Sequence, residues 1–173
     1  MKTIIYIFII ALTFTSCNTN TLQSYLVDHK SDENFISVDF SLRTFVDNFD
    51  ELDPEQKEIF EDVNKVNLLA FKKNGSNGDA YQTKSQQLID ILSNEFKEGE
   101  LMSLNMDGNF MKMYAEGLDS TVKEIVVYAS NNEKGFIVAR LLGDDLNPKN
   151  FIKMAEMSGQ MDFDSLSGII EGM

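Results

Sequence analysis

The side chains that could do chemistry are few in this chain of 173 residues. Cys17 is the only cysteine and His29 the only histidine. Without a second cysteine, the chain forms no internal disulfide, and a zinc site built on several thiolates is excluded. His29 has no second histidine or cysteine at the spacing of metal ligands. We therefore interpret His29 as a solvated side chain rather than a metal ligand.

Cys17 lies directly after a segment that is typical of an export signal. Lys2 gives a positive start, and residues 4–14, IIYIFIIALTF, are apolar. Eleven residues suit the apolar region of a signal peptide and fall short of the ~20 that span a bilayer. Residues 14–17, FTSC, resemble a bacterial lipobox, in which the cysteine is acylated and the chain is cleaved before it. The sequence therefore predicts a lipoprotein signal peptide over residues 1–16 and lipidation of Cys17, by palmitate or a similar chain. An ordinary secretory signal with an incidental cysteine is the alternative.

The residues after Cys17 predict a location. Position 18 is Asn and lacks the Asp that retains lipoproteins at the inner membrane, and residues 18–23, NTNTLQ, carry no acidic export signal. More than one acyl chain anchors a protein stably, because each buried CH₂ contributes about 0.8 kcal/mol. We therefore expect a lipid-anchored protein of the cell envelope, on the periplasmic face of the outer membrane.

The net charge of the chain argues against two classes of partner. Cleavage before Cys17 leaves 173 − 16 = 157 residues, the length of one domain, and removes one lysine, which changes the net charge from −13 to −14. A field of that sign repels phosphate backbones, so we expect no nucleic acid, and it disfavours electrostatic docking on anionic lipid. Residues 47–62 hold eight carboxylates and one lysine, which we interpret as a solvated surface rather than a docking face for a basic partner.

Motifs of known catalytic and ligand sites do not occur in the sequence. It contains no G-x-S-x-G, H-E-x-x-H or G-x-x-x-x-G-K-[ST] pattern. Gly75 and Gly78 stand before an expected helix, but no Lys-Ser/Thr pair follows them, so a plain turn is the better interpretation. Asp162 and Asp164 begin like a calcium loop, but Leu166 falls where the third ligand should be. We expect no catalytic centre, no metal and no cofactor.

Methionine forms the one unusual cluster, since all eight methionines after Met1 lie at or beyond position 102. An expected hairpin over residues 101–117 places five apolar side chains on one face of the sheet. They are Met102, Leu104, Met106, Met111 and Met113. Filling of a core against the helices is the interpretation we favour, because methionine adapts to irregular gaps. An adaptable binding groove and a thioether site for Cu(I) are the alternatives.

The elements that would position these residues follow from periodicity and turn signals. Strands are expected over residues 35–40, 65–73, 122–129 and 135–143, together with the hairpin, and helices are expected to begin at Ser41, Asp53, Asp79 and Asn147. This order predicts an α+β fold, with a mostly antiparallel sheet of about five to six strands and helices packed on one face. The domain is expected over residues 34–158, after a lipidated tether over 17–33 and before a short tail over 159–173.

The order of these segments resembles one known family. FISVDFSLRTF, KVNLLAFKK, LMSLNMDGNFMKMYAEG and GFIVARLLGDDLNPKNF are similar to domain-of-unknown-function family 4252, small lipoproteins of Bacteroidota-type envelopes, over roughly residues 33–157. The resemblance implies an envelope lipoprotein and brings no established activity, cofactor or binding residues. We therefore expect a non-catalytic module that binds an envelope protein or a ligand. The alternative is a carboxylate-based hydrolase with two converging acids.

Overall fold

The computed structural model describes residues 20–41, 54, 57, 61–106, 108–117 and 121–151. Cys17, the expected signal peptide, most of the acidic segment and the tail lie outside these residues, as does the helix expected to follow Ser41. Of the segment where a helix was expected to begin at Asp53, residues 54, 57, 61 and 62 are described and are helical.

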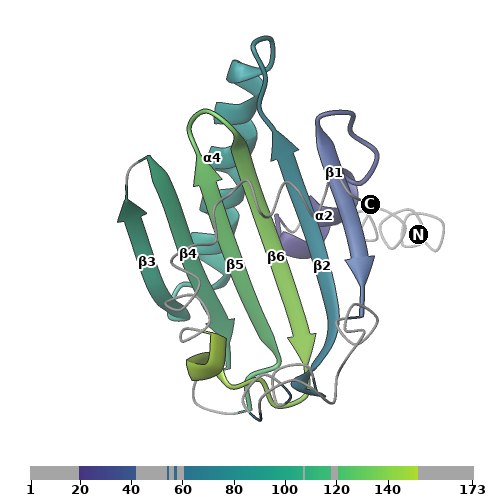
Figure 1. The fold of residues 1–173 in the computed structure, drawn as a ribbon, viewed down its shortest axis with the longest axis vertical. Helices are drawn as coiled ribbons and strands as arrows, with labels where there is room; N and C mark the ends of the chain where they lie inside the picture. Colours follow the sequence, from purple (N-terminus) through teal and green to yellow (C-terminus); the bar gives the residue numbers. More distant parts are fainter. Residues whose placement is uncertain are drawn as a thin grey trace, which may run out of the picture.

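Six strands form a single antiparallel sheet (Figure 1). They are β1 (Phe35–Phe40), β2 (Val63–Lys72), β3 (Glu100–Met106), β4 (Asn109–Glu116), β5 (Glu124–Asn131) and β6 (Gly135–Gly143). The spatial order is β1-β2-β6-β5-β4-β3, so β1 and β3 are the edges, and every neighbouring pair is antiparallel. The predicted α+β class and the antiparallel sheet are confirmed.

Two helices, α2 (Leu22–Asp28) and α4 (Gly78–Glu95), lie on the same face of the sheet, behind it in Figure 1. On α4, Tyr81, Leu88 and Leu92 repeat at helical spacing and are buried against the strands. The start of α4 differs from the prediction. Asn77 is the N-cap, and Asp79 lies inside the first turn, where its negative carboxylate is attracted to the positive end of the helix dipole.

Helix α2 contradicts the prediction of a tether over residues 17–33. Thr21 caps the helix and forms a capping box with Ser24. Leu22, Tyr25 and Leu26 recur at spacings of three and four and are buried in the same core as α4. Residues 22–33 are therefore part of the folded domain, because the sheet leaves an apolar surface beside α4 that this helix covers.

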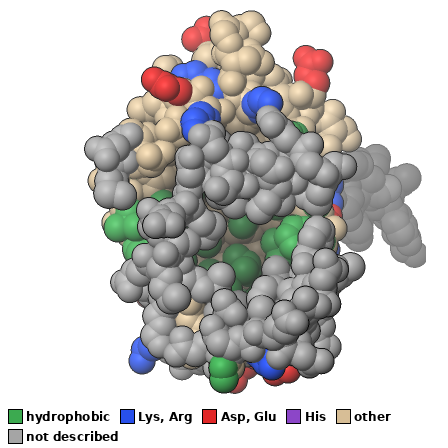
Figure 2. Space-filling view, in the orientation of Figure 1, with side chains coloured by type: hydrophobic (Ala, Val, Ile, Leu, Met, Phe, Trp, Pro, Cys, Tyr) green, Lys and Arg blue, Asp and Glu red, His purple; other side chains and the backbone are tan. Residues whose placement is uncertain are grey.

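The other face of the sheet carries a second, separate cluster of apolar side chains. Val63, Val66, Met113, Ala115, Val122, Ile125, Leu146 and Phe151 form it. Phe151 lies in a helical segment whose described residues begin at Pro148, shown in yellow-green below β4 in Figure 1. Figure 2 shows hydrophobic side chains on this face, the one turned away from α2 and α4. The sheet therefore buries apolar groups on both sides.

Candidate functional site

A groove opens between α4 and the strand ends of the hairpin and β5, on the helix-covered side of the sheet. Its volume is about 560 Å³, within the range of sites that hold small ligands. Tyr81, Gln82, Ser85, Gln86, Ile89, Asn105, Gly108, Phe110, Tyr128, Ser130 and Asn132 line it. We call this feature the α4 groove.

Hydroxyl groups form the floor of the α4 groove. The Ser85 Oγ and the Tyr128 hydroxyl oxygen are 2.8 Å apart, within hydrogen-bond distance. The Tyr81 hydroxyl also donates to the carbonyl oxygen of Asn131, at 3.4 Å. Burial raises the pKa of Tyr128 and of Tyr81, so both phenols are neutral at physiological pH. The floor is thus a set of uncharged hydroxyl groups, three of which are held by hydrogen bonds within the protein.

The wall and the rim of the α4 groove are uncharged too. Phe110 is half-buried and contacts Tyr128 edge to face, with the ring centroids 6.2 Å apart. Four exposed amide side chains stand around it, those of Gln82, Gln86, Asn105 and Asn132. Among the described residues that line the groove, none carries a charge. One aromatic ring and a set of neutral hydrogen-bonding groups therefore face the open space.

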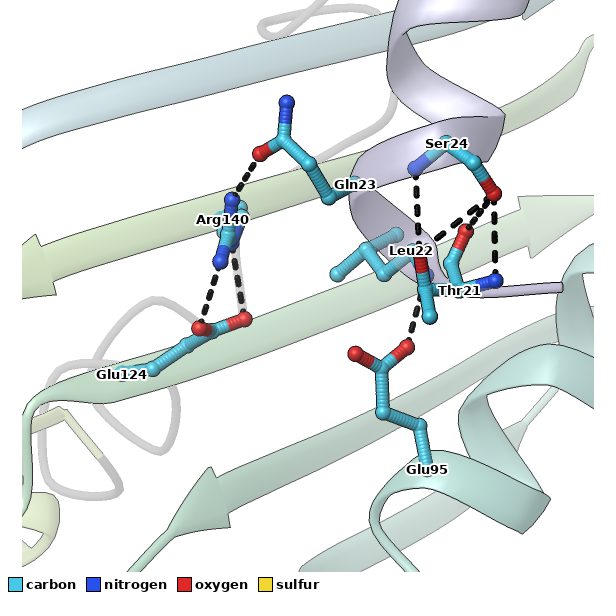
Figure 3. A network of polar contacts seen from close by, with 7 residues as sticks. All are labelled: Thr21, Leu22, Gln23, Ser24, Glu95, Glu124 and Arg140. Carbon is cyan, nitrogen blue, oxygen red and sulfur yellow. Dashed lines mark hydrogen bonds and ion pairs between the residues drawn. The ribbon is translucent and has the colours of Figure 1, made fainter. Parts of the chain in front are cut away.

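A buried ion pair on the same side of the sheet connects β5 and β6 to α2 (Figure 3). Arg140 on β6 donates from Nε to Oε1 of Glu124, at 2.8 Å, and from Nη2 to Oε2, at 2.7 Å. Its Nη1 donates to the side-chain oxygen of Gln23 on α2. The side chains of Arg140 and Glu124 are 16% and 8% exposed, so the pair is largely removed from water. The hydrogen bonds that Arg140 donates to the Glu124 carboxylate raise the pKa of Arg140 and keep the guanidinium charged.

The ion pair continues into a polar row across the sheet. Asp39, Asn67 and Arg140 are direct cross-strand neighbours on β1, β2 and β6. Asp39 accepts a hydrogen bond from Lys30 Nζ at 2.6 Å and from Asn67 Nδ2 at 2.5 Å, and these bonds hold its pKa below the usual range. The row borders a small polar pocket of about 90 Å³. Asp39 is an ion-paired carboxylate at neutral pH and cannot act as a general acid.

The N-terminus of α2 is fixed by α4 in the same network. Glu95 on α4 accepts a hydrogen bond from the backbone N–H of Leu22, with its Oε2 at 2.6 Å (Figure 3). This carboxylate satisfies one of the unpaired donors of the helix start. The polar contacts of α2 therefore join it to both the sheet and the other helix.

Residues 29–154 match the family described as Domain of unknown function (DUF4252). The chain belongs to this family. The match covers more than half of the chain, and it begins at His29, so it includes all six strands and α4. No curated protein and no solved structure matches the chain.

His29 of this DUF4252 domain is a packed side chain, and the prediction of a solvated one is wrong. It is 8% exposed, stacks on Phe35 with the ring centroids 4.6 Å apart, and contacts Tyr25 edge to face. Burial, with the Lys84 ammonium 3.4 Å from Nε2, lowers the pKa of His29, although Asp32 acts in the opposite direction. His29 is therefore a neutral aromatic part of the core.

The methionine residues share a sheet face, as the register shows. Met102 pairs with Met113 and Leu104 with Met111 across β3 and β4. They do not pack against α2 and α4, which cover the opposite face; the described helical residue in their cluster is Phe151, in the segment where a helix was expected after Asn147. Met113 is 2% exposed in the cluster with Phe151, Met102 and Met111 are half-buried, and Met106 is the backbone partner of Asn109.

The described part of the DUF4252 chain offers neither a metal cluster nor a membrane span. It contains no group of three or more His, Cys, Asp or Glu placed to hold a metal ion. In the same residues no helix has both the length and the hydropathy that crossing a bilayer requires.

The lining of the α4 groove was not predicted from the sequence, apart from Tyr81 as part of the buried stripe of α4. Its residues come from one helix, three strands and two turns, and none belongs to a motif. One signal was present in the sequence. Gln82 and Gln86 form an exposed amide pair at helical spacing in a chain whose surface is otherwise dominated by carboxylates.

Proposed function

We propose that this chain is a lipid-anchored envelope protein whose DUF4252 domain binds a ligand or partner without catalysing a reaction, and that the α4 groove is the binding site. The observation that carries the binding role is the uncharged lining of the groove. Ser85 is a hydroxyl that could attack a substrate, but its partner is the phenol of Tyr128, whose raised pKa keeps it protonated, so it cannot take the serine proton.

The hydrolase alternative lacks support from the described residues. It needs two acids that converge on one substrate, one of them protonated. Asp39 and Glu124 are the carboxylates of the polar row, and each is bound to a cation, Lys30 or Arg140. Their role in the fold is to neutralise these cations.

The anchor rests on the sequence around Cys17, and the position of α2 defines its geometry. Residues 18–21 separate the expected lipid site from Leu22, the first residue of α2. A chain step spans at most about 3.6 Å, so a lipid on Cys17 would hold the start of α2 within about 18 Å of the attachment point. The domain would then work next to the membrane surface and not at the end of a long tether.

Metabolic labelling tests the anchor. Cells that express the full chain are fed an alkyne fatty acid, and the label and the membrane pellet are compared for wild type, Cys17→Ala and Ser16→Ala. Cys17→Ala should lose the label and leave the pellet, whereas Ser16→Ala keeps a small residue before the cysteine and should retain both. Asn18→Asp should move the protein from outer-membrane to inner-membrane fractions. Labelling that persists in Cys17→Ala would refute the anchor.

The fate of a bound molecule tests the binding role. The lipidated protein is captured from its own membranes, any co-purified molecule is identified by mass spectrometry, and the same molecule is then incubated with fresh protein. A binding module returns it unchanged, in an amount that falls when Phe110 is replaced by Ala. Recovery of a smaller hydrolysis product would show an enzyme instead.

A further inference from the structure

The chemistry of the α4 groove restricts the class of ligand it can hold. Phosphate, carboxylate and ammonium groups need an opposite charge when they leave water, and the described lining supplies none. A purely apolar ligand would displace water from the amides of the rim and offer them no hydrogen bond in return. The remaining class is a neutral molecule with many hydrogen-bonding groups and one apolar face.

We propose that the α4 groove binds an uncharged saccharide; this rests on the proposed function and names its ligand class. Each amide side chain offers a donor and an acceptor next to each other, and so do two neighbouring hydroxyl groups of a sugar ring. Gln82, Asn105 and Asn132 place three such groups around the opening, and Gln86, whose Nε2 donates to Asp90 Oδ1 at 2.8 Å, adds its amide oxygen. One sugar unit can therefore exchange its water for a full set of partners.

Phe110 supplies the surface for the apolar face of the sugar. The axial C–H groups of a pyranose carry a small positive charge, and the face of an aromatic ring is negative, so the two attract beyond the area they bury. Phe110 is the half-exposed ring of the groove, whereas Tyr81 and Tyr128 are buried. Its edge contact with Tyr128 helps to hold it in place, and Lys112 Nζ, paired with Glu100, lies 5.9 Å from its centroid.

The floor of the groove is ordered before a ligand arrives. Ser85 and Tyr128 are hydrogen-bonded to each other, and Tyr81 is hydrogen-bonded to the backbone of Asn131. Binding therefore does not have to immobilise these side chains, which lowers its entropic cost. The amides are exposed at the rim, where they can adapt to the stereochemistry of the sugar.

A saccharide fits this place better than a peptide does. Proteins that bind extended peptides at a sheet use the unpaired backbone of an edge strand. The α4 groove lies on the helix-covered face, and its polar groups are side chains of α4, β3, β5 and the loop after β5. The partners it offers are thus discrete amides and hydroxyls, not a row of backbone groups.

Isothermal titration of the mature chain with a panel of neutral hexasaccharides tests the proposal. The probes are cellohexaose, maltohexaose, laminarihexaose, mannohexaose and chitohexaose, with polyalanine and inorganic phosphate as the competing classes. We expect one or more sugars to bind. Phe110→Ala and Gln82→Ala should each weaken that binding at least tenfold, while Phe110→Tyr should retain it. Leu104→Ala, on the other face of the sheet, is the control and should change nothing.

Two outcomes of the titration overturn the proposal. One is the absence of binding by every sugar to a chain that unfolds cooperatively. The other is sugar binding that neither Phe110→Ala nor Gln82→Ala weakens. If Phe110→Ala does not fold, the result for Gln82→Ala is used alone. If the molecule recovered from membranes is a peptide or a lipid whose binding still depends on Phe110, only the saccharide is wrong. If the recovered molecule is indifferent to both variants, the groove itself is not the site.

Discussion

Removal of α2 should destroy most of the stability of the domain. A chain that starts at Asn34 lacks Leu22, Tyr25 and Leu26, all buried in the core shared with α4. Full burial of a large apolar side chain contributes about 1.5–3 kcal/mol, so the three together amount to roughly 5–9 kcal/mol before the entropy of ordering the helix is subtracted. Domains of this size are stable by only about 5–15 kcal/mol.

Urea unfolding followed by circular dichroism measures this loss, with a chain from Asn18 as the reference. The shorter chain should show either no cooperative transition or one at a much lower midpoint. Two neighbouring point variants provide the matched comparison, because Leu26 is buried and Val27 is 53% exposed. Leu26→Ala should cost about 2–5 kcal/mol, whereas Val27→Ala should change the free energy of unfolding by less than about 0.5 kcal/mol. Equal midpoints for the chains from Asn18 and Asn34 would show that the domain folds without α2 and refute the reasoning.

Three further predictions follow from the buried groups. Glu124→Gln leaves the Arg140 guanidinium without its counter-charge and should lower the free energy of unfolding in urea by about 3–5 kcal/mol. The double variant Glu124→Leu, Arg140→Met should recover most of that loss. Equal losses in the single and the double variant would contradict this role of the ion pair. Folding lowers the pKa of His29 from 6.5, so the unfolded chain takes up the proton at a higher pH than the folded chain does. The free energy of unfolding that this residue contributes is therefore fully present above pH ~6.5 and declines below it. In melts between pH 7.5 and 5.5, His29→Phe should show a smaller decline than wild type, and equal declines would contradict this assignment. Met113→Ala should cost about 2–5 kcal/mol and Leu104→Ala, at a site 46% exposed, less than about 1 kcal/mol; the reverse order would place the core elsewhere.

The strands and the long helix could be predicted because their patterns are local. Residues 36–40 alternate with a period of two, and Tyr81, Leu88 and Leu92 follow the period of a helix, so each face was visible in the sequence. The hairpin needed one more signal, which Gly108 gave. Its φ of 80° at the turn is the conformation that glycine adopts without strain.

Helix α2 could not be predicted in the same way, because what holds it is distant in the sequence. Its seven residues are too few for a periodicity to stand out. The backbone carbonyl oxygen of Lys84 accepts a hydrogen bond from Tyr25 at 3.0 Å, and Glu95 binds the N–H of Leu22. His29 was misread for the same reason, since the partner that buries it is Phe35, beyond a turn that carries no apolar pattern.

The period of a strand shows which side chains share a face, but not which face the helices cover. Met111 and Met113 were placed correctly beside each other, yet the side of the sheet that α2 and α4 occupy depends on Leu69, Phe71 and Tyr128 of other strands. Tyr128 also forms the floor of the α4 groove, where its hydroxyl meets Ser85. The same placement of α4 that completes the core therefore leaves an opening at its N-terminal half, lined with the amides of the helix surface and the strand ends. A binding site of this kind is a by-product of where a helix crosses a sheet, so its residues carry no motif and become recognisable only when the fold brings them together.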